Sequence, residues 1–316
     1  MSGLAWLTQS LEVLAGVSLA PLFLGWVNQC RAWLQNRRAP SLLLPYRGIR
    51  KLFHKDAVLA ENASRLFRAA PYVVFGAMVA AAAIIPSMGT GLPFTTAADA
   101  IALVGLLATA RVFMALAAMD IGTAFGSLGA RREMMIGFLA EPALLMVIFV
   151  ASLISATTAL PLIAERLAVQ APALYPSLAF TAVAFTIVLL AENARIPVDN
   201  PATHLELTMI HEAMLLEYSA RHLALMEWAA ALKLFNYACI GFALFVPWGV
   251  SVGEPDPAAL LLSIPVLIAK LAAAGVWLAL LETVSAKLRV FRAPEFLATA
   301  FMFAVLGMLV HLLLGA

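Results

Sequence analysis

The sequence predicts an all-α, polytopic membrane protein with about eight transmembrane helices. Apolar residues make up 63% of its 316 residues, whereas charged residues make up only 12%. Soluble domains are about 45–50% apolar and about 25% charged, so burial in a soluble core does not account for this composition. The mean hydropathy of +0.95 points the same way. We therefore expect a single transmembrane domain over residues 1–316.

Eight stretches of the chain are long and apolar enough to form transmembrane helices, which need roughly 20 apolar residues. The longest polar stretch, about residues 31–68, is too small to form a core of its own, so no soluble domain is predicted. The predicted spans are about residues 4–30, 69–89, 99–119, 137–160, 174–192, 222–248, 258–281 and 294–315.

The basic residues orient these spans, because cytoplasmic loops carry an excess of Lys and Arg. With the first loop in the cytoplasm, sixteen of the 20 Lys and Arg residues lie on that side and Arg166 alone lies on the other. The remaining three, Arg111, Lys233 and Lys270, fall within spans. The predicted topology therefore places both termini on the outer, periplasmic side.

Charge and cysteine content exclude several classes of function. The net charge of +2 implies no nucleic-acid partner. Cys30 and Cys239 form no CxxC pair, so they cannot by themselves ligate an iron–sulfur cluster or a tetrahedral zinc ion. His211-Glu212 does not continue into an HExxH motif, and a surface role is favoured over a metal site. We expect no metal and no cofactor in this chain.

Acidic residues gather between the fifth and sixth predicted spans, at the cytoplasmic rim. Acids at the mouths of membrane helices are costly to keep there, which makes them candidates for function. Six of the eighteen acids lie in this stretch, namely Glu192, Asp199, Glu206, Glu212, Glu217 and Glu227.

This central stretch has helical signals. Asn200 can cap a helix with Pro201 at its first position, and Thr203-x-x-Glu206 is a competing capping box. Further on, Glu217 and Arg221 have the i,i+4 spacing of an ion pair on one helical face. The stretch is therefore predicted to be helical.

Ionisable residues also lie inside the spans, at an insertion cost of about 2.5–3.5 kcal/mol each. One explanation is that these residues form static ion pairs, which fix the positions of neighbouring helices relative to one another. The other is a proton or cation pathway, because carboxylates in a poorly solvated interior can exchange protons near neutral pH. The residues concerned are Glu12, Arg111, Glu141, Glu227, Lys233, Lys270 and His311 within spans, with Glu192 and Glu282 at inner ends.

Two inner loops allow alternative interpretations. The first loop is basic and mildly amphipathic over residues 45–56, which suits either anionic headgroups or a soluble partner. In the loop between the third and fourth predicted spans, we expect Gly122, Gly126 and Gly129 to permit close turns rather than to hold a phosphate.

The central stretch resembles the membrane subunit 1 family of respiratory complex I. The family signature is roughly E-x-N-R-x-P-F-D, then acids, then E-Y-S, then a Glu in the next span. This chain has ENARIPVD at residues 192–199, EYS at residues 217–219 and then Glu227. Weaker similarity covers the segment from Leu128 to Glu141 and the first inner loop, so the resemblance extends over most of the chain.

Departures from the complex I pattern point to a particular branch of that family. Val198 stands in place of the usual Phe, and residues 202–204 lack the further acids of complex I. Leu44 and Gly48 occupy polar positions of the first loop. The segment DNPATHLELTMIHE, residues 199–212, is similar to the formate hydrogenlyase and hydrogenase-4 branch, in which subunit 1 anchors a [NiFe]-hydrogenase and reduces no quinone.

The resemblance implies a membrane-anchoring and proton-relay subunit of a group 4 [NiFe]-hydrogenase complex in the bacterial cytoplasmic (inner) membrane. It implies hydrogenase large and small subunits, a ferredoxin-like iron–sulfur subunit and antiporter-like membrane subunits as partners, besides the lipid bilayer. The [NiFe] centre and [4Fe-4S] clusters would lie in those partners, so this chain would hold no catalytic residue. The alternatives are subunit 1 of a quinone-reducing complex I-type oxidoreductase, a free-standing ion carrier, or a scaffold without proton traffic.

Two sets of site residues follow from the ionisable groups and the resemblance together. The predicted proton relay comprises Glu141, Glu192, Glu217, Glu227, Lys233, Lys270 and Glu282. The predicted hydrogenase-docking rim comprises Arg132, Arg195, Asp199, Glu206, Glu212 and Arg221.

Overall fold

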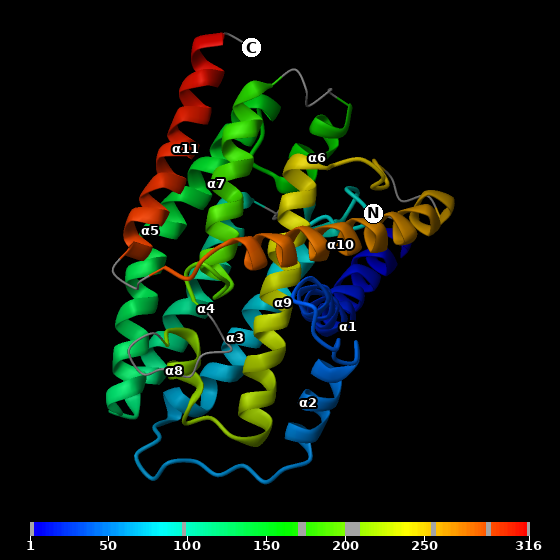
Figure 1. The fold of residues 1–316 in the computed structure, drawn as a ribbon. Coiled ribbons are helices and arrows are strands. Elements are labelled where there is room, and N and C mark those ends of the chain that lie inside the picture. Colours follow the sequence, from blue (N-terminus) through cyan, green and yellow to red (C-terminus); the bar gives the residue numbers. More distant parts are fainter. Residues whose placement is uncertain are drawn as a thin grey trace.

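The computed structural model describes residues 3–96, 99–169, 175–199, 209–253, 257–288 and 292–314 (Figure 1). Within these ranges the chain forms helices joined by loops, and seven helices are long and apolar enough to cross a membrane. These are α1 (Gly3–Leu34), α3 (Arg65–Ile84), α4 (Ala100–Asp120), α5 (Ala124–Ser155), α9 (Ala220–Phe245), α10 (Pro257–Val284) and α11 (Ala293–Leu314). The prediction of an all-α polytopic membrane protein is confirmed.

The fifth predicted span coincides with a shorter apolar helix, α7 (Pro176–Glu192). Its 17 residues extend about 25 Å at 1.5 Å per residue. That length is at the lower limit for a helix that crosses the hydrocarbon core. Each of the eight predicted spans therefore overlaps one helix, seven of them of full membrane length.

Polar side chains set the beginnings of several membrane helices. The hydroxyl of Ser64 accepts a hydrogen bond from Leu66 N at 3.0 Å and caps α3. Asp99 caps α4 by accepting from Ile101 N at 3.0 Å. Each cap satisfies a backbone N–H group that has no partner inside its helix.

The beginning of α5 differs from its prediction. The helix starts at Ala124, capped by Thr123, rather than near residue 137. The expectation that Gly126 and Gly129 belong to an inner loop is therefore wrong. Hydropathy alone placed the start too late, because the first turns of α5 carry charged residues and extend beyond the apolar part of the helix.

Shorter helices lie in three of the predicted loops. α2 (Leu44–Phe53) lies in the basic first loop, with Ile49 as its buried residue. α6 (Leu160–Val169) lies in a predicted outer loop and buries five of its ten residues. The central loop contains α8 (His211–Leu215), and a single 3-10 turn, η1 (Pro93–Thr96), precedes α4.

The long helices do not all run in one direction. In Figure 1, α5, α7, α9 and α11 run roughly upright, whereas α10 crosses in front of them beside α1. Trp26 of α1 donates its indole N–H to the carbonyl of Ala272 on α10 at 3.0 Å. A Cβ atom at Gly275 would come within 2.8 Å of Trp26 Nε1, so this glycine lets the two helices touch.

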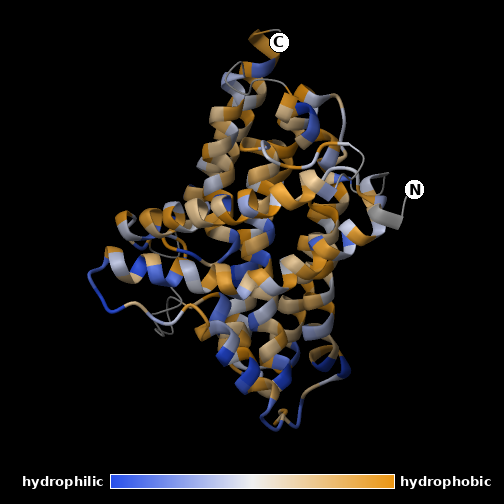
Figure 2. Ribbon diagram, turned by 90° about the vertical axis from the view of Figure 1, so that its right-hand side faces the viewer, coloured by the Kyte–Doolittle hydropathy of each residue, from blue (hydrophilic) through white to orange (hydrophobic). Residues whose placement is uncertain are grey.

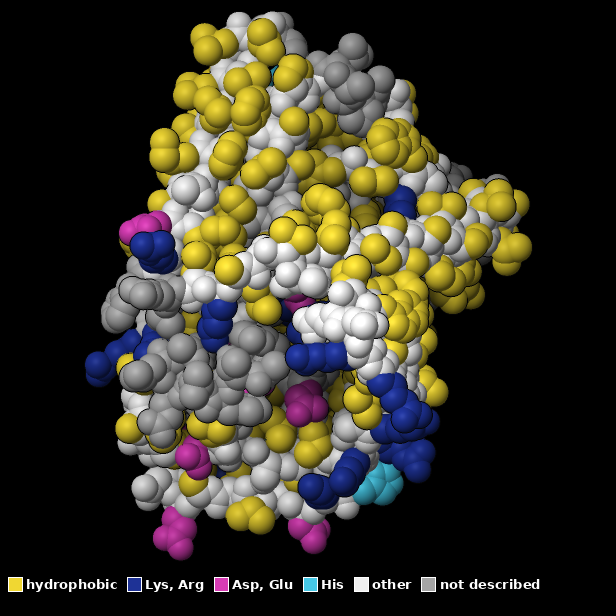
Figure 3. Space-filling view, viewed as in Figure 1, with side chains coloured by type: hydrophobic (Ala, Val, Ile, Leu, Met, Phe, Trp, Pro, Cys, Tyr) yellow, Lys and Arg dark blue, Asp and Glu magenta, His cyan; other side chains and the backbone are white. Residues whose placement is uncertain are grey.

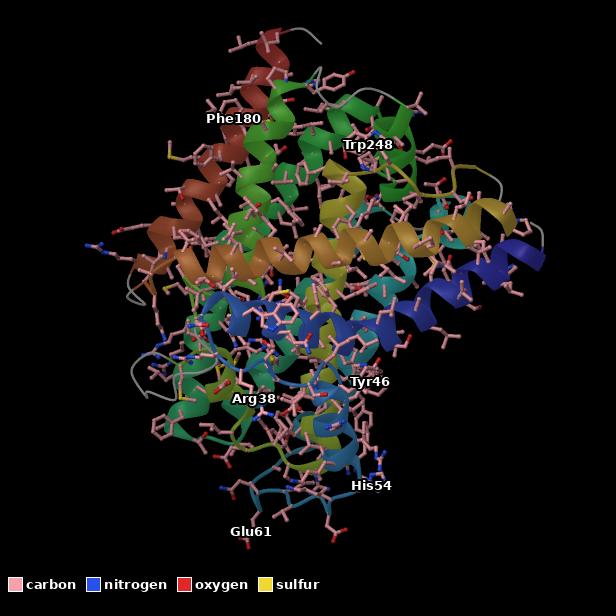
Figure 4. The ribbon with its side chains drawn as sticks, turned by 45° about the vertical axis from the view of Figure 1, so that its right-hand side comes forward. Arg38, Tyr46, His54, Glu61, Phe180 and Trp248 are labelled. Carbon is pink, nitrogen blue, oxygen red and sulfur yellow. The ribbon has the colours of Figure 1, made fainter. Side chains whose placement is uncertain are left out.

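Charged side chains concentrate toward one end of the molecule. In Figure 3, Lys, Arg, Asp and Glu gather mainly below α10, whereas the surface above is largely apolar. Figure 2 shows the same division in the hydropathy of the ribbon. Arg38, His54 and Glu61 of the first inner loop lie at the end opposite Phe180 and Trp248 (Figure 4).

Glu12 in α1 belongs to the apolar end and is 1% exposed. Its Oε1 accepts hydrogen bonds from the backbone N–H groups of Met88 and Gly89, both at 2.7 Å. The same loop is joined to the α9–α10 connection, because Ser251 N donates to the carbonyl of Met88 at 2.8 Å. Glu12 thus fixes the loops at this end of the bundle.

Candidate functional site

Arg111 on α4 lies at the centre of a buried group of charged side chains. Its guanidinium pairs with the carboxylates of Glu141 and Glu192. Its Nε lies 3.6 Å from Oε1 of Glu133. The Arg111 side chain is 2% exposed, so its charge is stabilised by these carboxylates in place of water.

Two of these carboxylates come from one face of α5. Glu133, Gly137 and Glu141 are spaced four residues apart, which places them along one side of the helix. A Cβ atom at Gly137 would lie 2.7 Å from Cδ of Arg111 and would overlap its guanidinium. The glycine therefore leaves the space in which Arg111 lies between the two acids.

Lys233 on α9 completes the group. Its Nζ lies 2.9 Å from Oε2 of Glu192, the last residue of α7. We call Arg111, Lys233, Glu133, Glu141 and Glu192 the charge cluster. It joins α4, α5, α7 and α9 and has a formal charge of −1 when all five groups are ionised.

The short helix α8 is held against the cluster by three contacts. A Cβ atom at Gly129 would lie 2.8 Å from the carbonyl oxygen of Ile210, so α8 packs directly on the backbone of α5. Arg132 donates to the carbonyl of Met209 at 2.8 Å. Asp199 accepts from the backbone N–H of His211 at 3.2 Å. One turn beyond Gly129 on α5, Glu133 Oε2 lies 3.9 Å from His211 Nδ1.

The EYS motif holds the first inner loop in place. The ring of Tyr218 stacks on Phe67 at 4.0 Å, and its hydroxyl donates to the Phe67 carbonyl at 3.1 Å. Burial raises the pKa of the Tyr218 hydroxyl, which therefore stays protonated as a donor. The hydroxyl of Ser219 accepts from Val58 N at 3.0 Å and donates to the Val58 carbonyl.

Two cavities adjoin the cluster. The small cavity has a volume of about 30 Å³ and is lined by Arg111 and Lys233 among apolar side chains. The rim cavity has a volume of about 520 Å³ and lies between α1, α2, α8 and α9. Among the described residues, three line both cavities and so form part of the wall between them, namely His211, Leu215 and Ala230.

The structure brings part of the predicted relay together. Glu141, Glu192 and Lys233 meet in the charge cluster. Glu227 lines the rim cavity with an exposed side chain. Glu227 is therefore separated from the other three residues by the wall between the two cavities.

Three other relay residues lie elsewhere. Glu282 pairs with Arg31 at 3.3 Å and with Arg195 at 3.1 Å, where α10 ends. Lys270 donates to the carbonyl of Val246 at 2.6 Å, just beyond the end of α9. Glu217 is exposed in the turn that separates α8 from α9.

That turn also corrects one local prediction. Glu217 and Arg221 do not share a helical face, because α8 ends at Leu215 and α9 begins at Ala220. The predicted helix start near Asn200 lies outside the described residues.

The predicted rim divides in the same way. Arg195, Asp199 and Glu212 line the rim cavity. Arg132 holds the start of α8, and Arg221 is exposed at the start of α9. Glu206 lies outside the described residues.

Sequence reasoning missed two members of the cluster. Arg111 was recognised as an ionisable residue in a span but was not assigned to the relay. Glu133 was not considered, because its segment was expected to be a loop. The spacing of Glu133, Gly137 and Glu141 was the available signal, since it repeats one helical face.

Metal ligands do not gather in the part of the chain that the structure describes. No group of three or more His, Cys, Asp or Glu side chains is close enough there to hold a metal ion. Cys30 and Cys239 are both buried and free.

Comparison with known proteins places this site in a family. The family model described as NADH dehydrogenase matches residues 8–313. Formate hydrogenlyase subunit 4 of Escherichia coli (strain K12) is 34% identical over 312 residues, covering 97% of this chain and 98% of the relative. Hydrogenase-4 component C of the same organism is 37% identical over 254 residues, covering 80% of this chain and 78% of the relative.

A solved structure shares the fold. A chain of the membrane-bound sulfane sulfur reductase, an archaeal respiratory membrane complex, superimposes with a TM-score of 0.81 at 19% identity. The match covers 96% of this chain and 98% of that chain. The sequence matches and the shared fold lead to one conclusion: this chain belongs to the NADH dehydrogenase subunit 1 family, and it is a membrane subunit of the complex I-like and hydrogenase-type respiratory complexes.

Proposed function

We propose that this chain anchors a [NiFe]-hydrogenase to the bacterial cytoplasmic membrane and relays protons for a formate hydrogenlyase-like complex. The observation that carries this proposal is the charge cluster, in which three carboxylates face two cations. The cluster has one carboxylate more than it has cations, and a carboxylate in a poorly solvated site without a full counter-charge can take up and release a proton. The small cavity provides room beside it for about one or two water molecules.

The proposed relay runs from the rim cavity to the charge cluster. Glu227 receives the proton in the rim cavity, and Glu192 and Glu141 carry it onward within the cluster. Lys233 modulates this transfer, because its ammonium competes with a proton for Glu192. Lys270 and Glu217 lie apart from this path, and Glu282 is paired with Arg31 and Arg195, so these three residues are left out of it.

The proposed topology has eight spans with both termini on the outer side. In that arrangement the basic first loop and the rim cavity face the cytoplasm, which the excess of Lys and Arg in the proposed inner loops supports. The hydrogenase large and small subunits, with their [NiFe] centre and iron–sulfur clusters, would dock on this rim beside a ferredoxin-like subunit. Antiporter-like membrane subunits would receive the protons. The curated relatives named for formate hydrogenlyase and hydrogenase-4 support this choice.

Glu227→Gln tests the relay. Gln has the shape of Glu but cannot carry the proton, so we expect the ratio of protons moved to electrons transferred to fall at least about tenfold. The amount of assembled complex should stay the same, because Glu227 is exposed in the cavity rather than packed. The measurement is proton movement per turnover in liposomes that contain the complex purified through this chain.

The matched control is Glu295→Gln, which changes an exposed acid in the first turn of α11. It should leave the ratio unchanged. An unchanged ratio in Glu227→Gln would show that protons do not pass this carboxylate.

A second function, subunit 1 of a quinone-reducing complex, is favoured by the size of the rim cavity. The proteins that copurify with this chain distinguish the two. A hydrogenase large subunit with four cysteine ligands supports the hydrogenase assignment, and a partner lacking those cysteines supports quinone reduction. Purification of the chain alone as an active ion carrier would contradict both.

A further inference from the structure

His211 occupies a distinctive position between the two cavities. Among the described residues, three line both cavities, and two of these, Leu215 and Ala230, have no titratable group. Of these three, His211 is the one that can accept a proton on one side and release it on the other. Its imidazole is suited to this, because one ring nitrogen can take up a proton while the other gives one away.

The contacts around α8 hold this histidine in a fixed place. Its backbone N–H donates to Asp199, and the preceding Met209 carbonyl accepts from Arg132. The tight packing of Ile210 on Gly129 fixes the distance from α8 to α5. A histidine with only a surface role would not need to be held in place by so many contacts.

On the cluster side, Nδ1 of His211 faces Glu133. The two atoms Nδ1 and Oε2 are 3.9 Å apart, slightly beyond a direct hydrogen bond, and Nδ1 is buried without a hydrogen-bond partner. Proton-transfer pairs are often this long in a resting structure and shorten when they act. Arg111 and Lys233 face the same side through the small cavity.

On the opposite side, the rim cavity presents groups that can supply a proton. Asp199, Glu212 and Glu227 line it together with Arg31 and Arg195. Its volume of about 520 Å³ holds many water molecules, so protons can reach His211 from these groups through water.

We propose that His211 is the proton-transfer residue that connects the rim cavity to the charge cluster. Nδ1 of the neutral imidazole releases its proton to Glu133 as Nε2 takes up a proton from the rim cavity, which leaves the ring neutral in the other tautomer. Moving the proton back from Nε2 to Nδ1 restores the starting tautomer for the next transfer. This proposal rests on the proposed proton relay and names the step by which protons enter it. Glu133 is then the first acceptor of the cluster.

The test is His211→Ala in the purified complex, with and without added imidazole. We expect the ratio of protons moved to electrons transferred to fall at least about tenfold. Free imidazole should restore part of it, because the rim cavity is large enough to admit the molecule beside the new space. Rescue by imidazole separates proton transfer from a structural role, since a displaced helix would not be restored by a small base.

The matched control is His311→Ala on α11, a buried histidine whose Nδ1 also has no hydrogen-bond partner and which lines neither cavity. It should keep the full ratio. If His211→Ala keeps the ratio while Glu227→Gln loses it, protons reach the cluster by another route and this proposal is overturned. If both variants keep it, the proposed relay itself fails. A loss in His211→Ala that imidazole does not restore at all also overturns the proposal and assigns a structural role.

Discussion

Arg111→Met is expected to remove nearly all assembled complex from the membrane. The substitution keeps most of the side-chain volume but leaves the buried Glu133 and Glu192 and the partly exposed Glu141 with only Lys233 as a cation. Breaking a buried ion pair by removing one partner costs about 3–5 kcal/mol, and here one side chain serves three acids. Folded proteins have a stability of only about 5–15 kcal/mol, so this loss is a large part of the whole.

The measurement is the amount of the chain in membranes that copurifies with its partners, together with its unfolding temperature in detergent. Arg111→Lys should be intermediate, because a single ammonium cannot reproduce the planar fork that contacts several carboxylates. The double variant Arg111→Met with Glu133→Gln restores the formal charge of −1 and should recover part of the stability. Normal assembly of Arg111→Met would mean that the acids of the cluster are not held by this arginine.

Gly129→Ala is expected to displace α8 and disrupt proton transfer, although it adds only one methyl group. The new Cβ atom would lie 2.8 Å from the Ile210 carbonyl oxygen and 2.9 Å from the Ala213 Cβ atom. Backbone atoms cannot turn aside as a flexible side chain does, so α8 must move as a unit. Overpacking of this kind costs about 1–3 kcal/mol. Because α8 carries His211, we expect the ratio of protons to electrons to fall as well.

Gly105→Ala on α4 is the matched control. A Cβ atom there has no neighbour within 4 Å, and alanine favours a helix by about 1 kcal/mol over glycine. Gly105→Ala should therefore unfold at the same or a higher temperature and keep full coupling. Equal unfolding temperatures and equal coupling for Gly129→Ala and Gly105→Ala would contradict the close packing of α8 on α5.

The membrane fold was predictable because it follows from local properties of the chain. A helix that crosses the hydrocarbon core needs about 20 apolar residues, and the sequence has such stretches at α1, α3 and α4. The start of α5 was not predictable from hydropathy, since its first turns are charged and become part of a helix through the Thr123 cap and packing against α8.

The candidate site was predictable in part. Glu141, Glu192 and Lys233 were selected because ionisable groups in membrane helices are costly, and they do meet in the cluster. The same reasoning selected Lys270, which instead donates to a backbone carbonyl beyond the end of α9. The free-energy cost of placing an ionisable group in a membrane helix shows that the group needs a partner, but it does not show which residue that partner is.

By itself the sequence determined that this protein is helical and lies in a membrane. It also determined that the membrane spans contain several ionisable residues, which are costly to leave unpaired in a bilayer. Only the tertiary structure decided that Arg111 lies among three acids, and that His211 forms part of the wall between two cavities. The physical reason is that hydropathy is a property of each segment, whereas electrostatic pairing depends on distances between helices that lie far apart in the chain.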